Sequence, residues 1–261
     1  MDEKFKQLAH QIVEKICKGV KKEAKKNFYK LGKTVGIGAD GSPTAYIDTV
    51  AEDIALKELE KSQIKVNLLS EERGFIDFGG TYVFVLDPID GTRNACRGIP
   101  FYSVSLAIGT SRISDIDYGI VKNIPTGDVF SAEKHRGAYL NNSPIHVCEM
   151  PSHELLSSIS LGKTYTPKAG VLSKKGNVRS LGSASLEMCL VAVSALDYYF
   201  IGKSILRVID IAASTLIVRE AGGVVQTITG ANLDMELNIN EKTSVLAACS
   251  EQLISELLTR A

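Results

Sequence analysis

The segment with the clearest chemical potential runs from Asp87 to Thr92 and reads Asp-Pro-Ile-Asp-Gly-Thr. It follows an apolar run at 82–86, which predicts a buried strand. Because proline cannot donate to the ladder of a central sheet, we expect the chain to turn at Pro88. Asp87 and Asp90 would then lie at the carboxyl end of the strand, where α/β proteins commonly bind ligands.

A second strand-like run, at 65–69, is followed by Glu71 and Glu72. If the two strands are neighbours, Glu71 lies close to Asp87 and Asp90, and such a cluster is costly without a cation. A site of oxygen ligands without His or Cys favours a hard ion, magnesium first. The alternative is a simple Asp-Gly turn with solvated acids, which is less consistent with two acids behind a buried strand.

Several further residues could contact a phosphate or its leaving group. Gly91 allows a ligand to approach the backbone closely, and a helix that begins nearby would offer free N–H groups to a phosphate. Asp210 is either a helix cap or another metal ligand, and it could be both. Arg179, Lys203 and Arg207 are candidate contacts for phosphate or sugar, although exposed basic residues are often only solvated.

The pattern of the chain predicts two α/β halves, 1–145 and 146–261, packed as one unit. Apolar residues at helical spacing mark a first helix from Phe5 to Val20, and a second helix is expected at 48–61. The glycine-rich stretch 32–43 is expected to be a mobile loop. Its match to GxGxxG at 36–41 is rejected as a dinucleotide site, since no buried strand precedes it. The remaining expected strands are 103–108, 117–121, 128–131, 157–161, 197–201 and 244–248, and the remaining expected helices are 183–194, 210–221 and 251–260.

The composition excludes several classes of protein. The 261 residues carry no formal net charge, which gives no attraction to nucleic acid or to an anionic membrane. The apolar runs are too short to span a bilayer. Five scattered cysteines and four histidines lack the spacing of a disulfide framework or a zinc site. A cytoplasmic location is therefore expected.

Taken together, these motifs resemble the signatures of the inositol monophosphatase family. Glu71-Glu72 and the segment 87–92 match its first signature, and the segment 210–213, Asp-Ile-Ala-Ala, matches its second. Gly182-Ser183-Ala184 and the segment 220–223 have the spacing of that family. The short loop 36–43 looks most like the archaeal branch, which combines inositol monophosphatase and fructose-1,6-bisphosphatase activities. The resemblance implies an α/β (α+β) fold, a layered αβαβα sandwich, and a homodimer.

The resemblance also implies roles for residues. Two or three Mg²⁺ ions, with Mn²⁺ as a possible substitute, would be held by a set of oxygen ligands: Glu71, Asp87, the carbonyl of Ile89, Asp90 and Asp210. Thr92, paired with Glu71, would activate the attacking water, and Asp40 would serve a further metal. The substrate would contact Asp90, Gly91, Thr92, Gly182 and Ser183. The chain departs from the family at Arg93, Ala95, Ile209 and Ser214, which puts the substrate preference in doubt rather than the catalysis.

The function implied is a magnesium-dependent phosphomonoesterase acting on fructose 1,6-bisphosphate, inositol 1-phosphate or both. Lys203 stands where inositol enzymes of the family have an acid, which favours the bisphosphate. Two alternatives stay open. One is a nucleotide phosphatase for NADP or 3′-phosphoadenosine phosphate, and the other is a non-catalytic protein that binds sugar phosphates.

Overall fold

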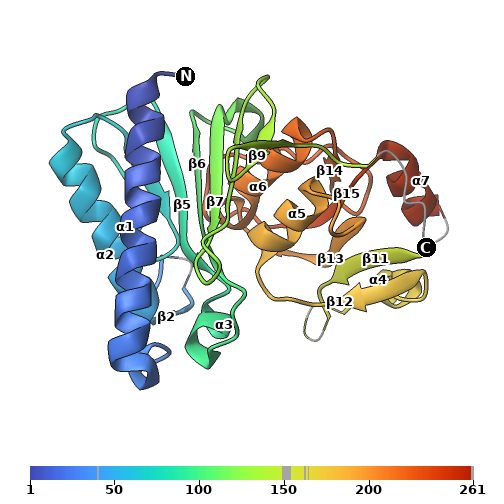
Figure 1. The fold of residues 1–261 in the computed structure, drawn as a ribbon, viewed down its shortest axis with the longest axis horizontal. Coiled ribbons are helices and arrows are strands. Elements are labelled where there is room, and N and C mark those ends of the chain that lie inside the picture. Colours follow the sequence, from blue (N-terminus) through green and yellow to red (C-terminus); the bar gives the residue numbers. More distant parts are fainter. Residues whose placement is uncertain (40, 149–153, 162, 164, 260–261) are drawn as a thin grey trace.

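The computed structural model describes residues 1–39, 41–148, 154–161, 163 and 165–259. Five layers stack side by side: two helices, an eight-stranded sheet, two helices, a five-stranded sheet and two more helices (Figure 1). This arrangement confirms the predicted αβαβα sandwich. The division of the chain at residue 145 stays a prediction, although the last strand of the larger sheet ends at Ile145.

The first layer consists of α1 (Glu3–Asn27) and α2 (Tyr46–Ser62). Phe5, Leu8, Ile12 and Ile16 form part of the stripe that α1 buries against the larger sheet, as the helical spacing predicts. A single 3₁₀ turn, η1 (Phe28–Lys30), follows α1. This layer covers one face of the larger sheet and leaves the opposite face to the middle helices.

The larger sheet has the strand order β10-β9-β8-β7-β6-β5-β3-β4. Its strands are β3 (Asn67–Ser70), β4 (Gly74–Ile76), β5 (Val83–Asp90), β6 (Ser103–Gly109), β7 (Tyr118–Asn123), β8 (Val129–Glu133), β9 (Ala138–Leu140) and β10 (Ser143–Ile145). β3 and β5 run parallel, with Ser70 opposite Leu86. The carboxyl ends of these two strands therefore meet at one edge of the sheet.

The middle layer consists of α5 (Ala184–Ala192) and α6 (Val208–Glu220). Both helices are buried on almost every side, because a sheet covers them from each direction (Figure 1). A helix in such a position is apolar all round and lacks the one-sided stripe of a surface helix. The first turns of both helices are directed at the edge where β3 and β5 end, as the contacts of Asp90 and Glu71 show.

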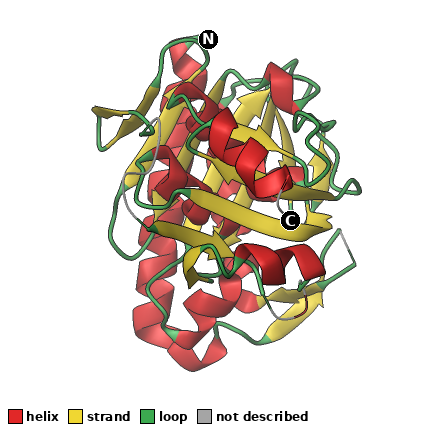
Figure 2. Ribbon diagram, turned by 90° about the vertical axis from the view of Figure 1, so that its right-hand side faces the viewer, coloured by secondary structure: helices red, strands yellow, loops and turns green. Residues whose placement is uncertain are grey.

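The smaller sheet has the order β12-β11-β13-β15-β14. Its strands are β11 (Leu155–Ile159), β12 (Gly176–Arg179), β13 (Tyr198–Leu206), β14 (Val224–Gln226) and β15 (Thr243–Ala248). Figure 2 looks onto the outer side of this sheet, which α4 (Pro167–Leu172) and α7 (Glu251–Thr259) cover. The expected end of the last helix at Arg260 lies outside the described residues.

Two local expectations from the sequence differ from the structure. The stretch expected as a loop contains a hairpin of β1 (Thr34–Ile37) and β2 (Pro43–Ala45). β5 does not end at Pro88 but continues to Asp90. Its pairing with β6 shifts register between Asp87 and Asp90, so the irregularity that proline requires is absorbed inside the strand. The short helices α3 (Thr92–Arg97) and η2 (Ile113–Asp115) follow.

Within the described ranges, none of the helices combines the length and the apolar character that crossing a bilayer requires.

The packing of α6 on the larger sheet depends on Gly119 in β7. A Cβ atom at this position would lie 2.9 Å from the carbonyl oxygen of Ala213 and 3.0 Å from its Cα. We therefore expect Gly119→Ala to push α6 away from the sheet and to lower the free energy of unfolding by about 1–3 kcal/mol. Urea denaturation measures this change. Gly36→Ala is the matched control, since no atom lies within 4 Å of its added Cβ. Equal stability of the two variants would contradict the packing role of Gly119.

Candidate active site

The sequence-predicted acids gather in one pocket at the carboxyl ends of β3 and β5. The pocket has a volume of about 250 Å³, and its lining is Glu71, Asp87, Ile89, Asp90, Gly91, Thr92, Arg93, Gly182, Arg207 and Asp210. The parallel pairing of β3 with β5 brings Glu71 beside the other acids, and α6 contributes Asp210 from a segment far away in the sequence. The fold thus unites both family signatures at a single site.

Asp90 is held in place by the first turn of α5. Its carboxylate accepts hydrogen bonds from Ser183 Oγ at 2.6 Å and from the backbone N–H of Ser185 at 2.7 Å. The Ser185 hydroxyl adds a third bond at 2.5 Å. These donors favour the ionised carboxylate, and the helix N-terminus adds to that effect. Ser183, a predicted substrate contact, therefore bonds to Asp90 in this structure.

Arg207 lies between two of the predicted metal ligands. Its Nη2 donates to Glu71 Oε1 at 2.8 Å and to Asp210 Oδ1 at 2.9 Å. Asp210 also accepts from the backbone N–H of Arg207 at 2.7 Å, so it caps α6 from inside its first turn. The guanidinium that was expected to contact substrate thus neutralises two acids of the pocket.

Thr92 has a different partner from the one expected. Its Oγ1 lies 3.1 Å from Asp48 Oδ1 and 3.0 Å from the carbonyl oxygen of Ile89, so Asp48 rather than Glu71 is its acidic partner. Sequence reasoning missed Asp48. A usable signal exists, because Asp48 and Glu52 stand four residues apart on the buried side of α2, where acids are rare.

Gly91 occupies a position that only glycine fits. Its φ of +93° is left-handed, and a Cβ atom would meet the carbonyl oxygens of Gly182 and Phe101 at 3.2 Å. The backbone of Gly91 therefore faces Gly182 across the pocket. Asn94 fastens the two segments, since its Nδ2 donates to the Leu181 and Phe101 carbonyls at 2.7 Å each.

Lys203 and Arg179 are not brought to this pocket. Lys203 is exposed, and its Nζ donates to the carbonyl oxygen of Lys163 at 2.7 Å. Arg179 is exposed as well, and its Nη1 donates to the carbonyl oxygen of its neighbour Val178 at 3.0 Å. Neither belongs to the lining of the carboxylate pocket. Asp40 lies outside the described residues, so its predicted role stays a prediction.

The pKa values of three acids in or beside the pocket are strongly perturbed. Burial, with the charge of Glu71, raises the pKa of Asp48 to about 8. Burial also raises the pKa of Glu71 to about 7, although Arg207 opposes this shift. The pKa of Asp87 lies well above its usual range, first because of burial and then because of Glu71 and Asp90. The pocket therefore holds more negative charge than its surroundings stabilise.

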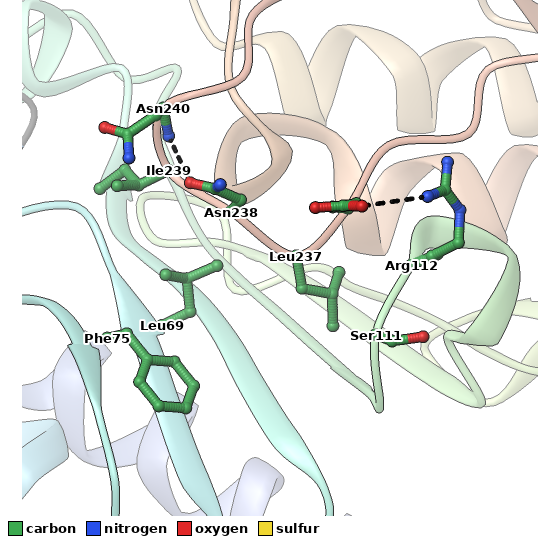
Figure 3. A pocket seen from close by; sticks show the side chains of 9 residues that line it. Leu69, Phe75, Ser111, Arg112, Leu237, Asn238, Ile239 and Asn240 are labelled. Atoms are coloured by element: carbon green, nitrogen blue, oxygen red, sulfur yellow. Dashed lines mark hydrogen bonds and ion pairs between the residues drawn. The ribbon is translucent and has the colours of Figure 1, made fainter.

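A larger cavity of about 570 Å³ lies elsewhere, between the β3–β4 edge and the segment 236–240 (Figure 3). Leu69, Phe75 and Leu237 supply its apolar walls, and Arg112 stands at its rim. The charge of Arg112 is already matched by Asp234 at 2.9 Å and by Glu236 at 3.6 Å. This cavity holds no cluster of reactive groups, so its size does not make it the active site.

The donor set of the carboxylate pocket fits a hard divalent cation, since it consists of carboxylate and carbonyl oxygens. In the part of the chain that the structure describes, no three His, Cys, Asp or Glu side chains stand close enough to hold an ion. The guanidinium of Arg207 lies between Glu71 and Asp210 and pairs with both. We infer that binding of an ion there requires Arg207 to withdraw.

The raised pKa values predict how stability depends on pH without metal. An acid whose pKa is higher in the folded than in the unfolded chain binds more protons when folded, so stability falls as pH rises between the two values. From the values of Glu71 and Asp48, we expect the thermal midpoint in chelator to fall from pH 5 to pH 8. Magnesium should flatten this slope. Asp87→Asn should also flatten the dependence of the thermal midpoint on pH. The slope that remains in this variant comes from the other titrating groups, so the variant serves as the control. A midpoint in chelator that rises over this range would contradict the prediction.

Comparison with known proteins agrees with the site. The model of the inositol monophosphatase family matches residues 1–261. A fructose-1,6-bisphosphatase/inositol-1-monophosphatase of Methanothermobacter thermautotrophicus is 36% identical and aligns with 87% of this chain and 86% of its own. A solved inositol monophosphatase-fructose 1,6 bisphosphatase has a TM-score of 0.86 at 30% identity, with full coverage of both chains.

A relative named for a different activity is equally similar. The bifunctional NADP phosphatase/NAD kinase of Methanococcus maripaludis is 36% identical over 93% of this chain, which spans about half of that relative (47%). Both relatives have names that include a phosphatase activity. On the strength of the family match and the assembled signatures, the chain belongs to the inositol monophosphatase family and is a phosphatase of that family.

Proposed function

We propose that the chain is a magnesium-dependent phosphomonoesterase that hydrolyses fructose 1,6-bisphosphate, inositol 1-phosphate or both. One observation carries this proposal: Glu71, Asp87, Asp90 and Asp210 line a single pocket, and burial raises the pKa values of Glu71, Asp87 and Asp90. Such a cluster is stabilised by a cation rather than by further protein groups. The non-catalytic alternative is disfavoured, since a binding protein has no need of all four acids together with Thr92.

The pocket offers magnesium the ligands that this ion prefers. Glu71, Asp87, the carbonyl of Ile89, Asp90 and Asp210 would hold two or three ions, and Mn²⁺ could substitute. When bound, magnesium would lower the pKa of the attacking water and neutralise the charge of the phosphate. Residues of the chain would carry out the remaining tasks of the reaction, which are proton transfer and phosphate binding.

Asp48 and Thr92 are placed to take a proton from the attacking water. Thr92 Oγ1 can donate to Asp48 Oδ1 and accept a hydrogen bond from water at the same time. Burial raises the pKa of Asp48 to about 8, so its carboxylate is a base matched to neutral pH. The proton would pass from water to Thr92 and from Thr92 to Asp48.

The phosphate itself would be held by backbone groups. Gly91 and Thr92 stand at the start of α3, where N–H groups lack helical partners. Gly182 faces this position from the α5 side, and Ser183 fixes Asp90 beneath it. The arrangement recognises a phosphate and leaves the rest of the substrate to looser contacts.

Three observations bear on the substrate. The fructose-1,6-bisphosphatase/inositol-1-monophosphatase relatives support a sugar or polyol phosphate. The equally similar NADP phosphatase/NAD kinase supports a nucleotide as the second candidate. Arg93, where the chain departs from the family pattern, lines the carboxylate pocket and two neighbouring cavities. A cation at that rim suits a substrate with a second anionic group. The homodimer that the resemblance implies and the cytoplasmic location expected from the cysteine pattern both stay predictions.

A panel of esters tests the substrate proposal. Phosphate release would be measured with magnesium from fructose 1,6-bisphosphate, inositol 1-phosphate, NADP and 3′-phosphoadenosine phosphate. We expect the highest kcat/KM on one of the first two compounds. A higher kcat/KM for NADP would replace the proposed substrate class with the nucleotide alternative, and no release from any of the four would contradict the proposal altogether.

Replacement of Arg93 tests the contact with a second anionic group. If its guanidinium binds the second phosphate, Arg93→Ala should lower kcat/KM for the bisphosphate by about ten- to a hundredfold and for inositol 1-phosphate much less. Arg97→Ala is the matched control, since Arg97 lies on the same short helix but outside the carboxylate pocket. Equal losses on both substrates would rule out a contact with the second phosphate.

The proton path predicts a selective loss of turnover. Asp48→Asn and Thr92→Val should each lower kcat by about 10²–10⁴-fold while KM changes little. Because the two residues act as a unit, the double variant should be no worse than the poorer single variant. Glu58→Gln is the control for a general disturbance of α2. Glu58 lies on the same helix as Asp48, but it accepts a hydrogen bond from Gln11 on the neighbouring helix. Additive losses in the double variant would show that the two residues act separately.

A further inference from the structure

Two glutamates stand behind the carboxylate pocket without lining it. Glu52 of α2 and Glu187 of α5 are each only 1% exposed, and neither belongs to the pocket lining. Each accepts a serine hydroxyl from the end region of a strand and a backbone N–H from a segment that does line the pocket. The two glutamates thus form the same arrangement on opposite flanks of one site.

Glu52 fastens the turn that carries Glu71. Its carboxylate accepts the hydroxyl of Ser70, the last residue of β3, and the backbone N–H of Arg73 at 3.3 Å. It also forms an ion pair with Arg73 Nε at 3.4 Å. Ser70 and Arg73 flank Glu71 on either side, so Glu52 fixes both ends of the turn that presents this acid to the pocket.

Glu187 fastens the segment on the opposite flank. It accepts the Ser158 hydroxyl of β11 and the backbone N–H of Leu181 at 2.8 Å. The next residue, Gly182, faces Gly91 where the phosphate would bind, and Asn94 holds the Leu181 carbonyl from the other side. Glu187 therefore sets how closely this segment approaches the proposed phosphate seat.

Buried carboxylates are expensive, and burial raises the pKa of both glutamates. A buried charge contributes little to net stability even when it is well bonded, since its desolvation offsets the gain. What such a group does supply is a strong, directional bond that fixes the segment it holds. Positional control of the pocket, rather than stability, therefore explains the two glutamates best.

We propose that Glu52 and Glu187 are positioning residues with separate tasks: Glu52 orients Glu71 for the metal, and Glu187 orients the segment 181–183 for the phosphate. The proposal rests on the proposed function of the pocket. Groups that orient the ligands of a metal commonly affect its affinity by about 10–100-fold, which sets the size of the expected effect.

The test compares two binding constants in two variants by calorimetry. Glu52→Gln should raise the Kd of magnesium by about 10–100-fold. Glu187→Gln should leave the Kd of magnesium within about threefold of the wild-type value and raise the Kd of inorganic phosphate, measured with saturating magnesium, by about tenfold or more. In Glu187→Gln, KM should rise together with the Kd of phosphate, and kcat should change less.

Asp197→Asn is the matched control for a general loss of stability. Asp197 is a buried acid that accepts the backbone N–H of Leu156 at 2.6 Å, outside the pocket. If a glutamine variant fails to fold, Ser70→Ala takes the place of Glu52→Gln, and Ser158→Ala takes the place of Glu187→Gln. Each serine variant should change the same binding constant as the glutamine variant it replaces, by a smaller factor.

Two results would overturn the proposal. One is that both glutamine variants change both constants alike, and the other is that neither differs from Asp197→Asn. A wild-type protein that hydrolyses none of the four esters would contradict the proposed function instead, while the two binding constants would still test the positioning roles.

Discussion

Electrostatic repulsion among buried acids is the constraint on which the site depends. Asp87 is 2% exposed, Asp90 is 9% exposed, and Glu71 and Asp210 stand at the same pocket. In the protein alone, Arg207 provides positive charge for Glu71 and Asp210, and donors from α5 support Asp90. The raised pKa of Asp87 shows that these partners do not meet the whole demand. The pocket can therefore receive more positive charge than the side chains around it supply.

The five layers place these acids where no short segment could. β3 and β5 bring Glu71 and Asp87 to one edge, and α6 delivers Asp210 from the middle layer. Because α6 is enclosed between two sheets, its position is fixed by packing over its whole length, with Gly119 allowing the closest approach. The geometry of the site thus follows from the sandwich as a whole.

Arg207 links the charge balance to the binding of metal. Its guanidinium bonds to two predicted ligands, so an ion that uses both must displace it. The predicted contact of Arg207 with substrate stays a prediction.

The part of the site that could be predicted from sequence lies in continuous motifs. The apolar run before Asp87, the two acids after β3 and the motif at Asp210 each predict local structure that the fold then assembles. Asp48 was missed because helical periodicity shows which face of α2 is buried but not what lies opposite. Lys203 and Arg179 do not line the pocket, since strand length alone does not fix where β12 and β13 direct their side chains, and their contact with substrate stays a prediction. The continuation of β5 past Pro88 depends on a register shift that only its partner β6 reveals.

The central claim is that a divalent cation completes the charge balance of the pocket and makes it catalytic. The most direct measurement is phosphate release from fructose 1,6-bisphosphate by protein freed of metal with a chelator and then supplied with magnesium. We expect no release above background in chelator and recovery of full activity when magnesium is in excess. Full activity in excess chelator would contradict it.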